Sequence, residues 1–166
     1  FTDSGSSVLP WTNMDVMPQS IVKLAHYGQT VLSDSILSVT ASGEGIKSTA
    51  DHFQFVFQRL IDEGSIVTKL NSLEEINDKC QAGVILRENA GQNSPFVMLS
   101  LSASNGIVFV SRDSAGKTVN TISTDASENT FPLWLKISRT ENEFMAMISN
   151  NGIDWSEKGR TSIALN

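Results

Sequence analysis

The chain has 166 residues, enough for one domain of ordinary size with a core that needs no disulfide or metal. Its net charge of −6 argues against duplex DNA or an anionic membrane surface as the main partner, because phosphate binding needs a basic face. The single cysteine, Cys80, excludes an internal disulfide, and no apolar run is long enough for a transmembrane helix.

The start of the chain is expected to be an arm and not part of the core. Residues 1–7 are mostly small and polar, so we expect a linker or arm over residues 1–10 and one domain over residues 11–166. The chain starts at Phe1, not Met, and contains no basic-then-apolar signal segment, so a mature or excised domain is expected. The abundance of Ser, Asn, Thr and Gly is common in extracellular β-proteins, so a secreted or cell-surface location is expected.

Short strands separated by turn residues are predicted along the whole chain. A strand or ordered arm is expected at residues 11–16, and a weak helical pattern at residues 20–25. Further strands are predicted at residues 30–34, 35–41, 51–58, 65–70, 82–88, 96–102, 107–112, within 113–128, and at 133–138, 143–149 and 161–165. Turn signals at intervals of roughly ten residues, with no long helix, predict an all-β fold, a two-sheet antiparallel β-sandwich.

The clearest strand covers residues 51–58, where three phenylalanines occupy one face and His52, Gln54, Val56 and Gln58 occupy the other. A helix would scatter these rings around its circumference, so the period of two favours a strand whose phenylalanine face backs the core. The turn signal at residues 62–64 then predicts that residues 65–70 return as the hairpin partner of this strand.

A second informative strand covers residues 82–88. Alternation places Ala82, Val84 and Leu86 on one face. If that face lies in the core, the opposite face presents a glycine gap at Gly83 and the guanidinium of Arg87. Such a face is unusual for a structural sheet and is plausible for a sheet that holds a ligand.

Several segments together resemble a known family. They are residues 49–58, 64–67, 82–88, 106–112, 133–139 and 149–155. In order and spacing they resemble the concanavalin A-like, laminin-G-like jelly-roll domains of bacterial secreted glycoside hydrolases and surface proteins, over about residues 11–165. The resemblance implies a jelly roll and an accessory, often sugar-binding module, although fold alone does not fix function. The family usually has Ser-x-Asp-Gly before its last tryptophan, where this chain has Asn151, which also tolerates a left-handed turn.

No catalytic residue is predicted. Glucanases of the same sandwich fold carry acidic residues at alternate positions of one strand, whereas here Glu74 and Glu75 are adjacent and Asp62 and Glu63 lie at a turn. No Gly-x-Ser-x-Gly elbow accompanies the two histidines. The resemblance implies that the chain is an accessory domain excised from a larger secreted polysaccharide-degrading enzyme, and the chain is not expected to be an enzyme itself.

A non-catalytic ligand face is the favoured alternative, because aromatic rings and planar hydrogen-bonding side chains hold sugars. The candidate ligand-binding residues are Arg87, Arg112, His52, Gln54, Gln58, Lys69, Trp11 and Tyr27. On a concave sheet the cations suit a carboxylated sugar, such as an acidic exopolysaccharide or pectin. The competing interpretation is that these are ordinary solvated side chains. Trp134 and Trp155 are predicted to lie in the core.

No cofactor is expected to be required, although structural calcium is an option. Candidate oxygen ligands are Asp113, Asp125 and Glu128, or Asp15 and Asp51, without the spacing of a known calcium loop. The expected partners are a polysaccharide and a linked catalytic domain, with no nucleic acid or membrane, and the chain is expected to be a monomer. The alternative functions are a surface adhesion or structural protein-interaction module and, less favoured, a glycoside hydrolase of the same fold.

Overall fold

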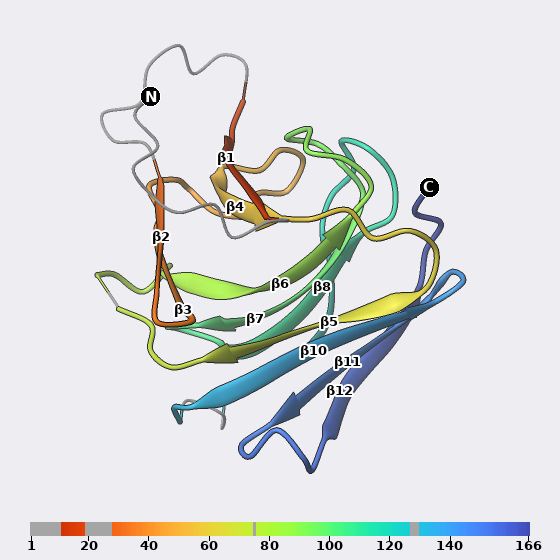
Figure 1. Cartoon of the computed structure of the whole chain (residues 1–166). Coiled ribbons are helices and arrows are strands. Elements are labelled where there is room, and N and C mark those ends of the chain that lie inside the picture. Colours follow the sequence, from red (N-terminus) through yellow and green to blue (C-terminus); the bar gives the residue numbers. More distant parts are fainter. Residues whose placement is uncertain (1–10, 19–27, 75, 127–129) are drawn as a thin grey trace.

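The computed structural model describes residues 11–18, 28–74, 76–126 and 130–166 (Figure 1). These residues contain strands and no helix, and so no helix that could span a membrane. The strands are β1 (Thr12–Val16), β2 (Gln29–Ser33), β3 (Ile36–Thr40), β4 (Phe53–Phe57), β5 (Gly64–Leu70), β6 (Gln81–Arg87), β7 (Phe96–Ser102), β8 (Gly106–Arg112), β9 (Asn120–Asp125), β10 (Leu133–Thr140), β11 (Glu143–Ser149) and β12 (Ser156–Ser162). The all-β prediction is confirmed.

Two four-stranded sheets form the body of the molecule. One has the order β12-β11-β10-β5 and the other β6-β7-β8-β9, and every strand pair in them is antiparallel. The sheets face each other, with β10 against β6 and β7, and β12 against β8 and β9 (Figure 1). This arrangement confirms the predicted two-sheet β-sandwich.

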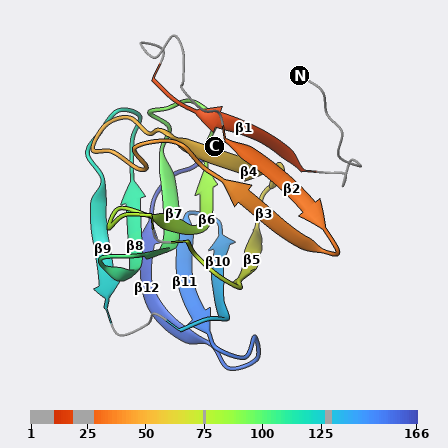
Figure 2. The same cartoon turned by 90° about the vertical axis from the view of Figure 1, so that its left-hand side faces the viewer.

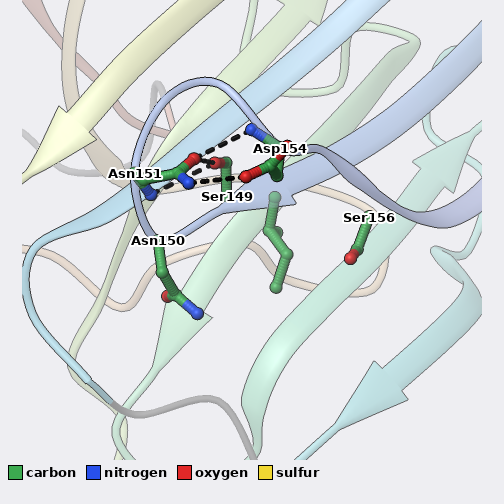
Figure 3. A pocket seen from close by; sticks show the side chains of 6 residues that line it. Ser149, Asn150, Asn151, Asp154 and Ser156 are labelled. Atoms are coloured by element: carbon green, nitrogen blue, oxygen red, sulfur yellow. Dashed lines mark hydrogen bonds between the residues drawn. The ribbon is translucent and has the colours of Figure 1, made fainter.

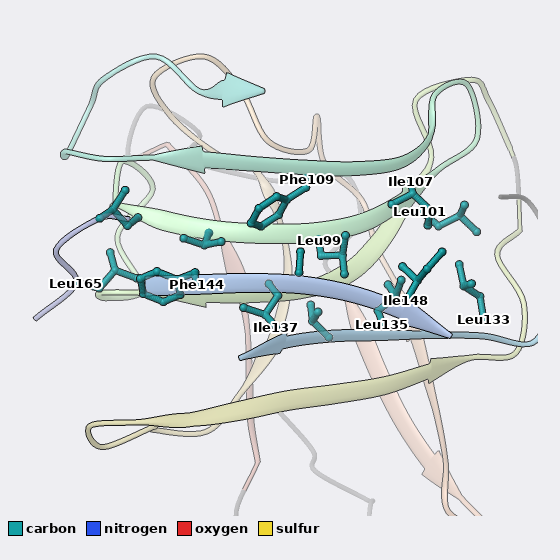
Figure 4. Packing of buried hydrophobic residues seen from close by; sticks show 14 residues of the cluster. Leu99, Leu101, Ile107, Phe109, Leu133, Leu135, Ile137, Phe144, Ile148 and Leu165 are labelled. Carbon is teal, nitrogen blue, oxygen red and sulfur yellow. The ribbon is translucent and has the colours of Figure 1, made fainter. Parts of the chain in front are cut away.

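The core lies between the two sheets and is built from alternate residues of each strand (Figure 4). Leu99 and Phe109 from one sheet and Leu135 from the other have no exposed surface. Val84 is 4% exposed within this cluster, and Leu86 packs against it. The prediction that this face of the 82–88 strand is the core face is therefore confirmed.

Two predicted hairpins are present. β7 and β8 are joined at Gly106, whose φ of +67° lies in the left-handed region that glycine adopts without a Cβ clash. β10 and β11 form the second hairpin, with Glu141 at positive φ in its turn.

The hairpin predicted between β4 and β5 is wrong. β4 pairs with β1, and β5 pairs with β10 in the sandwich. The turn after β4 carries the chain into a different layer, because Ile66 and Leu70 of β5 pack against the core. The sequence shows that both segments are strands but not which partner each one takes.

Strand β4 lies outside the sandwich, so the prediction that its phenylalanine face backs the core is also wrong. β1, β4 and the β2–β3 hairpin lie on the side of the β6-β7-β8-β9 sheet that faces away from β10 and β11 (Figure 1, Figure 2). The rings of Phe53 and Phe55 lie 5.3 and 5.8 Å from the guanidinium of Arg87, on the outer face of that sheet.

The last strand begins earlier than predicted. β12 covers Ser156–Ser162, whereas the sequence placed a strand at residues 161–165. Ile163 and Leu165 are buried in the core without forming a strand. These two residues are apolar because they fill the core. An apolar pattern of this kind is the same for a strand and for an irregular segment that packs into the core, so the sequence did not distinguish the two. The predicted linker at residues 1–10 and helical pattern at residues 20–25 lie outside the described residues.

Candidate functional site

Arg112, a predicted ligand residue, is fully buried and lacks a free donor. Its five N–H groups donate to the Asp51 carboxylate at 2.9 and 2.7 Å and to the main-chain carbonyls of Lys47, Ser94 and Lys117 at 2.8, 3.2 and 3.0 Å. Arg112 does lie on the non-core face of β8, as alternation requires. The residues before β4 cover that face, so the prediction that Arg112 meets a ligand is wrong.

Arg87 belongs to the same buried cluster. Its side chain is 2% exposed and lies 3.4 Å from Asp51, and its Nε donates to the carbonyl of Asn89 at 2.8 Å. Burial lowers the pKa of Arg87, Asp51 raises it, and the neighbouring Arg112 lowers it further. We call Asp51, Arg87 and Arg112 the Asp51 cluster. It fastens loop segments to the outer face of the β6-β7-β8-β9 sheet, and the Arg87 Nη1 is buried without a hydrogen-bond partner among the described residues.

The other predicted ligand residues are scattered. His52 and Gln54 are buried, at 6% and 9% exposure. Gln58 and Lys69 are exposed, but Lys69 lies on β5 in the opposite sheet. Trp11 is 43% exposed just before β1, and Tyr27 lies outside the described residues. These residues therefore do not form one surface, because the strands that carry them belong to different layers.

A different set of side chains gathers on the outer face of the β12-β11-β10-β5 sheet. Residues at even positions of β10 and odd positions of β5 and β11 point away from the core, since their neighbours fill it. We define the tryptophan face as Lys69, Trp134, Lys136, Met145, Met147 and Trp155. Trp134 pairs with Lys69 across the β5–β10 ladder. Lys136 pairs with Met147 across the β10–β11 ladder.

The two tryptophans of this face each lie beside a lysine. The Nζ of Lys69 lies 5.7 Å from the Trp134 ring, and the Nζ of Lys136 lies 5.4 Å from the Trp155 ring. Both rings are partly buried and neither belongs to the core cluster, so the prediction that they lie in the core is wrong. Leu133 and Leu135 point inward, so alternation along β10 turns Trp134 between them outward, which the core prediction did not take into account.

The turn before β12, drawn in Figure 3, lies beside Trp134 of this face. Asn151 accepts hydrogen bonds from the main-chain N–H groups of Ile153 and Asp154, both at 2.8 Å, and donates to the Asp154 carboxylate at 2.8 Å. An aspartate at position 151 could accept but not donate, which explains why asparagine suits this chain. Gly152 has φ of +75°, and a Cβ there would lie 3.0 Å from the Trp134 ring.

A shallow cavity of about 250 Å³ lies beside the same turn. It is lined by Ile148, Ser149, Asn150, Asn151, Asp154 and Ser156. Ser149 and Asn151 are occupied by hydrogen bonds within the turn. Figure 3 marks those that join Ser149, Asn151 and Asp154 as dashed lines. These polar groups are therefore used to shape the turn.

The predicted calcium ligands are dispersed in the part of the chain that the structure describes. Asp125 pairs with Lys158 at 2.7 Å, Asp51 pairs with Arg112, and Asp15 accepts a hydrogen bond from the Gly28 N–H. No three His, Cys, Asp or Glu side chains cluster among the described residues. Glu128 lies outside them, and calcium binding stays a prediction.

Comparison with known proteins gives no relative. No protein-family model, curated protein or solved structure matches this chain. Function is therefore inferred from the chain's own residues.

Proposed function

We propose that this chain is a non-catalytic carbohydrate-binding module of a secreted or cell-surface protein. It binds a polysaccharide on the tryptophan face and targets a linked polysaccharide-degrading enzyme. The sequence placed the ligand on the sheet that carries Arg87 and Arg112. We propose the tryptophan face instead, because the donors of those two arginines are buried.

The observation that carries the proposal is the pair of partly exposed indole rings on the outer face of the β12-β11-β10-β5 sheet. Trp134 and Trp155 are partly exposed, and Lys69 and Lys136 lie at their rings. An indole offers a flat apolar surface to the C–H face of a sugar, and nearby polar groups fix the orientation of the hydroxyls. Lys69, Trp134 and Lys136 are carried by strands, and a strand scaffold holds such groups more rigidly than a loop does. The resemblance to concanavalin A-like jelly-roll modules supports the same function.

Affinity gel electrophoresis against a panel of neutral and acidic polysaccharides tests this function. We expect retardation by at least one polysaccharide, and loss of retardation in Trp155→Ala with the urea unfolding midpoint retained. Trp11→Ala is the matched control, since Trp11 is 43% exposed and lies before β1 on the far side of the other sheet. Failure of every polysaccharide to retard the chain, or equal losses in the two variants, would contradict the proposal. Release of reducing sugar by the chain would contradict its non-catalytic part.

A surface adhesion or protein-interaction module is the second candidate, favoured by a different feature. The β2–β3 hairpin exposes apolar side chains along its length: Val31, Leu32, Ile36, Leu37 and Val39 are 38–54% exposed. Exposed apolar groups of this kind are typical of protein-contact surfaces. A pull-down with the chain and a Leu32→Ser/Leu37→Ser variant tests this alternative: a specific partner lost in the variant, with no polysaccharide bound, would favour it.

A further inference from the structure

Two lysines of the tryptophan face combine an aromatic contact with the lack of an ion pair. Elsewhere the described residues show this combination only at Arg139, which lies over the Phe144 ring and donates to the main-chain carbonyls of Glu141 and Leu165. Lys47, Lys158 and Arg160 each pair with a carboxylate within 3.2 Å, and the Asp51 cluster pairs Arg87 and Arg112. Lys69 and Lys136 have no carboxylate partner among the described residues, and each instead lies over a tryptophan ring. Lys79 and Lys117 also lack an ion pair there, but they are exposed in loops and contact no aromatic ring.

The acidic side chain that β12 contributes opposite Met147 of this face is occupied. Glu157, which pairs with Met147 across the β11–β12 ladder, accepts two hydrogen bonds from Arg160, each at 2.8 Å. The chain carries 18 acidic and 12 basic side chains, so unpaired ammonium groups on one sheet face are a local departure from its overall charge. A negatively charged ligand is the natural complement of this face.

The two lysines are free to exchange partners. Each Nζ lies more than 5 Å from the centre of its ring, which is a weak cation–π geometry at a partly exposed site. A ligand carboxylate can therefore draw the ammonium to the ring edge at little cost, because a charge-assisted hydrogen bond is the stronger interaction. The ring face is then left for a sugar to stack on, with its acid group held by the same lysine.

We infer that the tryptophan face binds a carboxylated polysaccharide, with Lys69 and Lys136 as the residues that recognise its charge. The inference rests on the proposed function, and adds the ligand class and its specificity residues. A neutral glucan would leave both ammonium groups unpaired. A protein partner with an acidic surface is the competing occupant.

Isothermal titration calorimetry of the whole chain with polygalacturonate and with alginate tests this inference, using the methyl ester of each as the matched uncharged ligand. We expect at least one acid to bind more than tenfold more tightly than its ester at low salt. Affinity should fall as salt is raised from 50 to 500 mM, because the contacts are exposed.

Charge-matched variants identify the residues. Lys69→Gln and Lys136→Gln should each weaken binding about three- to fivefold, the effect of one exposed ion pair. The double variant should bind the acid and its ester equally well. Lys79→Gln/Lys117→Gln removes the same total charge from loops elsewhere and should leave affinity unchanged. Unfolding midpoints in urea establish that each variant is folded.

The outcomes separate the two proposals. Equal binding of acid and ester, binding to neutral glucans alone, or equal losses in the two double variants would overturn the charge recognition and leave the carbohydrate-binding function standing. Failure to bind any polysaccharide in the panel would overturn both, and capture of an acidic protein through the same lysines would replace the ligand class.

Discussion

Removing the carboxylate of the Asp51 cluster should cost a large part of the stability of the fold. In Asp51→Ala the buried guanidiniums of Arg112 and Arg87 lose their counter-ion, which lies 2.7 Å from one and 3.4 Å from the other. Asp51 and Arg112 have no exposed side-chain surface, so water cannot replace the lost contacts. Breaking a buried pair in this way costs about 3–5 kcal/mol. For a chain of this length that is a fall in Tm of roughly 6–20 °C.

Equilibrium unfolding in urea, followed by tryptophan fluorescence, measures this loss. Glu157→Ala is the matched control, because Glu157 accepts two hydrogen bonds from Arg160 at 2.8 Å in nearly the same geometry but in solvent. We expect a lower midpoint with an unchanged m-value in Asp51→Ala and no measurable loss in the control. A loss below about 1 kcal/mol in Asp51→Ala, or equal losses in both variants, would refute the reasoning.

The Asp51 cluster holds two guanidiniums and one carboxylate, so it carries excess positive charge. A double-mutant cycle at Asp51 and Arg87 tests whether Asp51 stabilises the fold by offsetting that charge. Arg112 lowers the pKa of Arg87 through repulsion that Asp51 normally offsets. In the isosteric Asp51→Asn variant this repulsion is uncompensated, so Arg87→Met should destabilise it less than it destabilises the parent chain. We expect a coupling of about 0.5–3 kcal/mol between the two changes. Additive effects would show that burial of Arg87, and not its charge, determines its contribution.

Three further predictions concern the sandwich and its turns, all read from urea midpoints. Leu135→Ala should cost about 2–5 kcal/mol, because Leu135 is fully buried between the sheets and truncation leaves a cavity; the exposed Val67→Ala on the outer face should cost far less. Gly83→Ala should destabilise the β6–β7 pair, since a Cβ would lie 2.2 Å from the Leu99 carbonyl oxygen and 2.6 Å from the Ser100 Cα; tolerance of alanine would contradict this close approach. Asn151→Ala should cost about 0.5–1.5 kcal/mol, because it removes three exposed hydrogen bonds whose other groups can bond to water instead. Asn151→Asp should restore only the acceptor contacts, so full recovery would be the contrary result.

Much of the candidate site could not be predicted from the sequence, and Lys69 shows why. Its position on an outward face followed from alternation along 65–70, but its neighbour did not. The sequence grouped Lys69 with Arg87 and Arg112, whereas the strand ladder places it opposite Trp134. Pairing between β5 and β10 joins residues far apart in the chain, and no local pattern encodes which strands pair.

Arg87 and Arg112 show the same limit for burial. Alternation correctly put both on the non-core face of their strands. The face of a sheet that points away from the core is exposed only if nothing packs on it. Here Asp51 and the residues around it pack on that face. Local periodicity reports the side of a strand on which a residue lies, and does not report what packs above that side.

The sequence by itself determined the all-β class, most strand positions, two hairpins and the core face of the 82–88 strand. Each of these depends on neighbouring residues, through side-chain alternation or turn geometry. The tertiary structure decided the pairing of β4 with β1, the burial of the Asp51 cluster and the meeting of Lys69 with Trp134. These depend on which distant segments pack together, and that is determined by the free energy of the whole fold and not by any one stretch of chain.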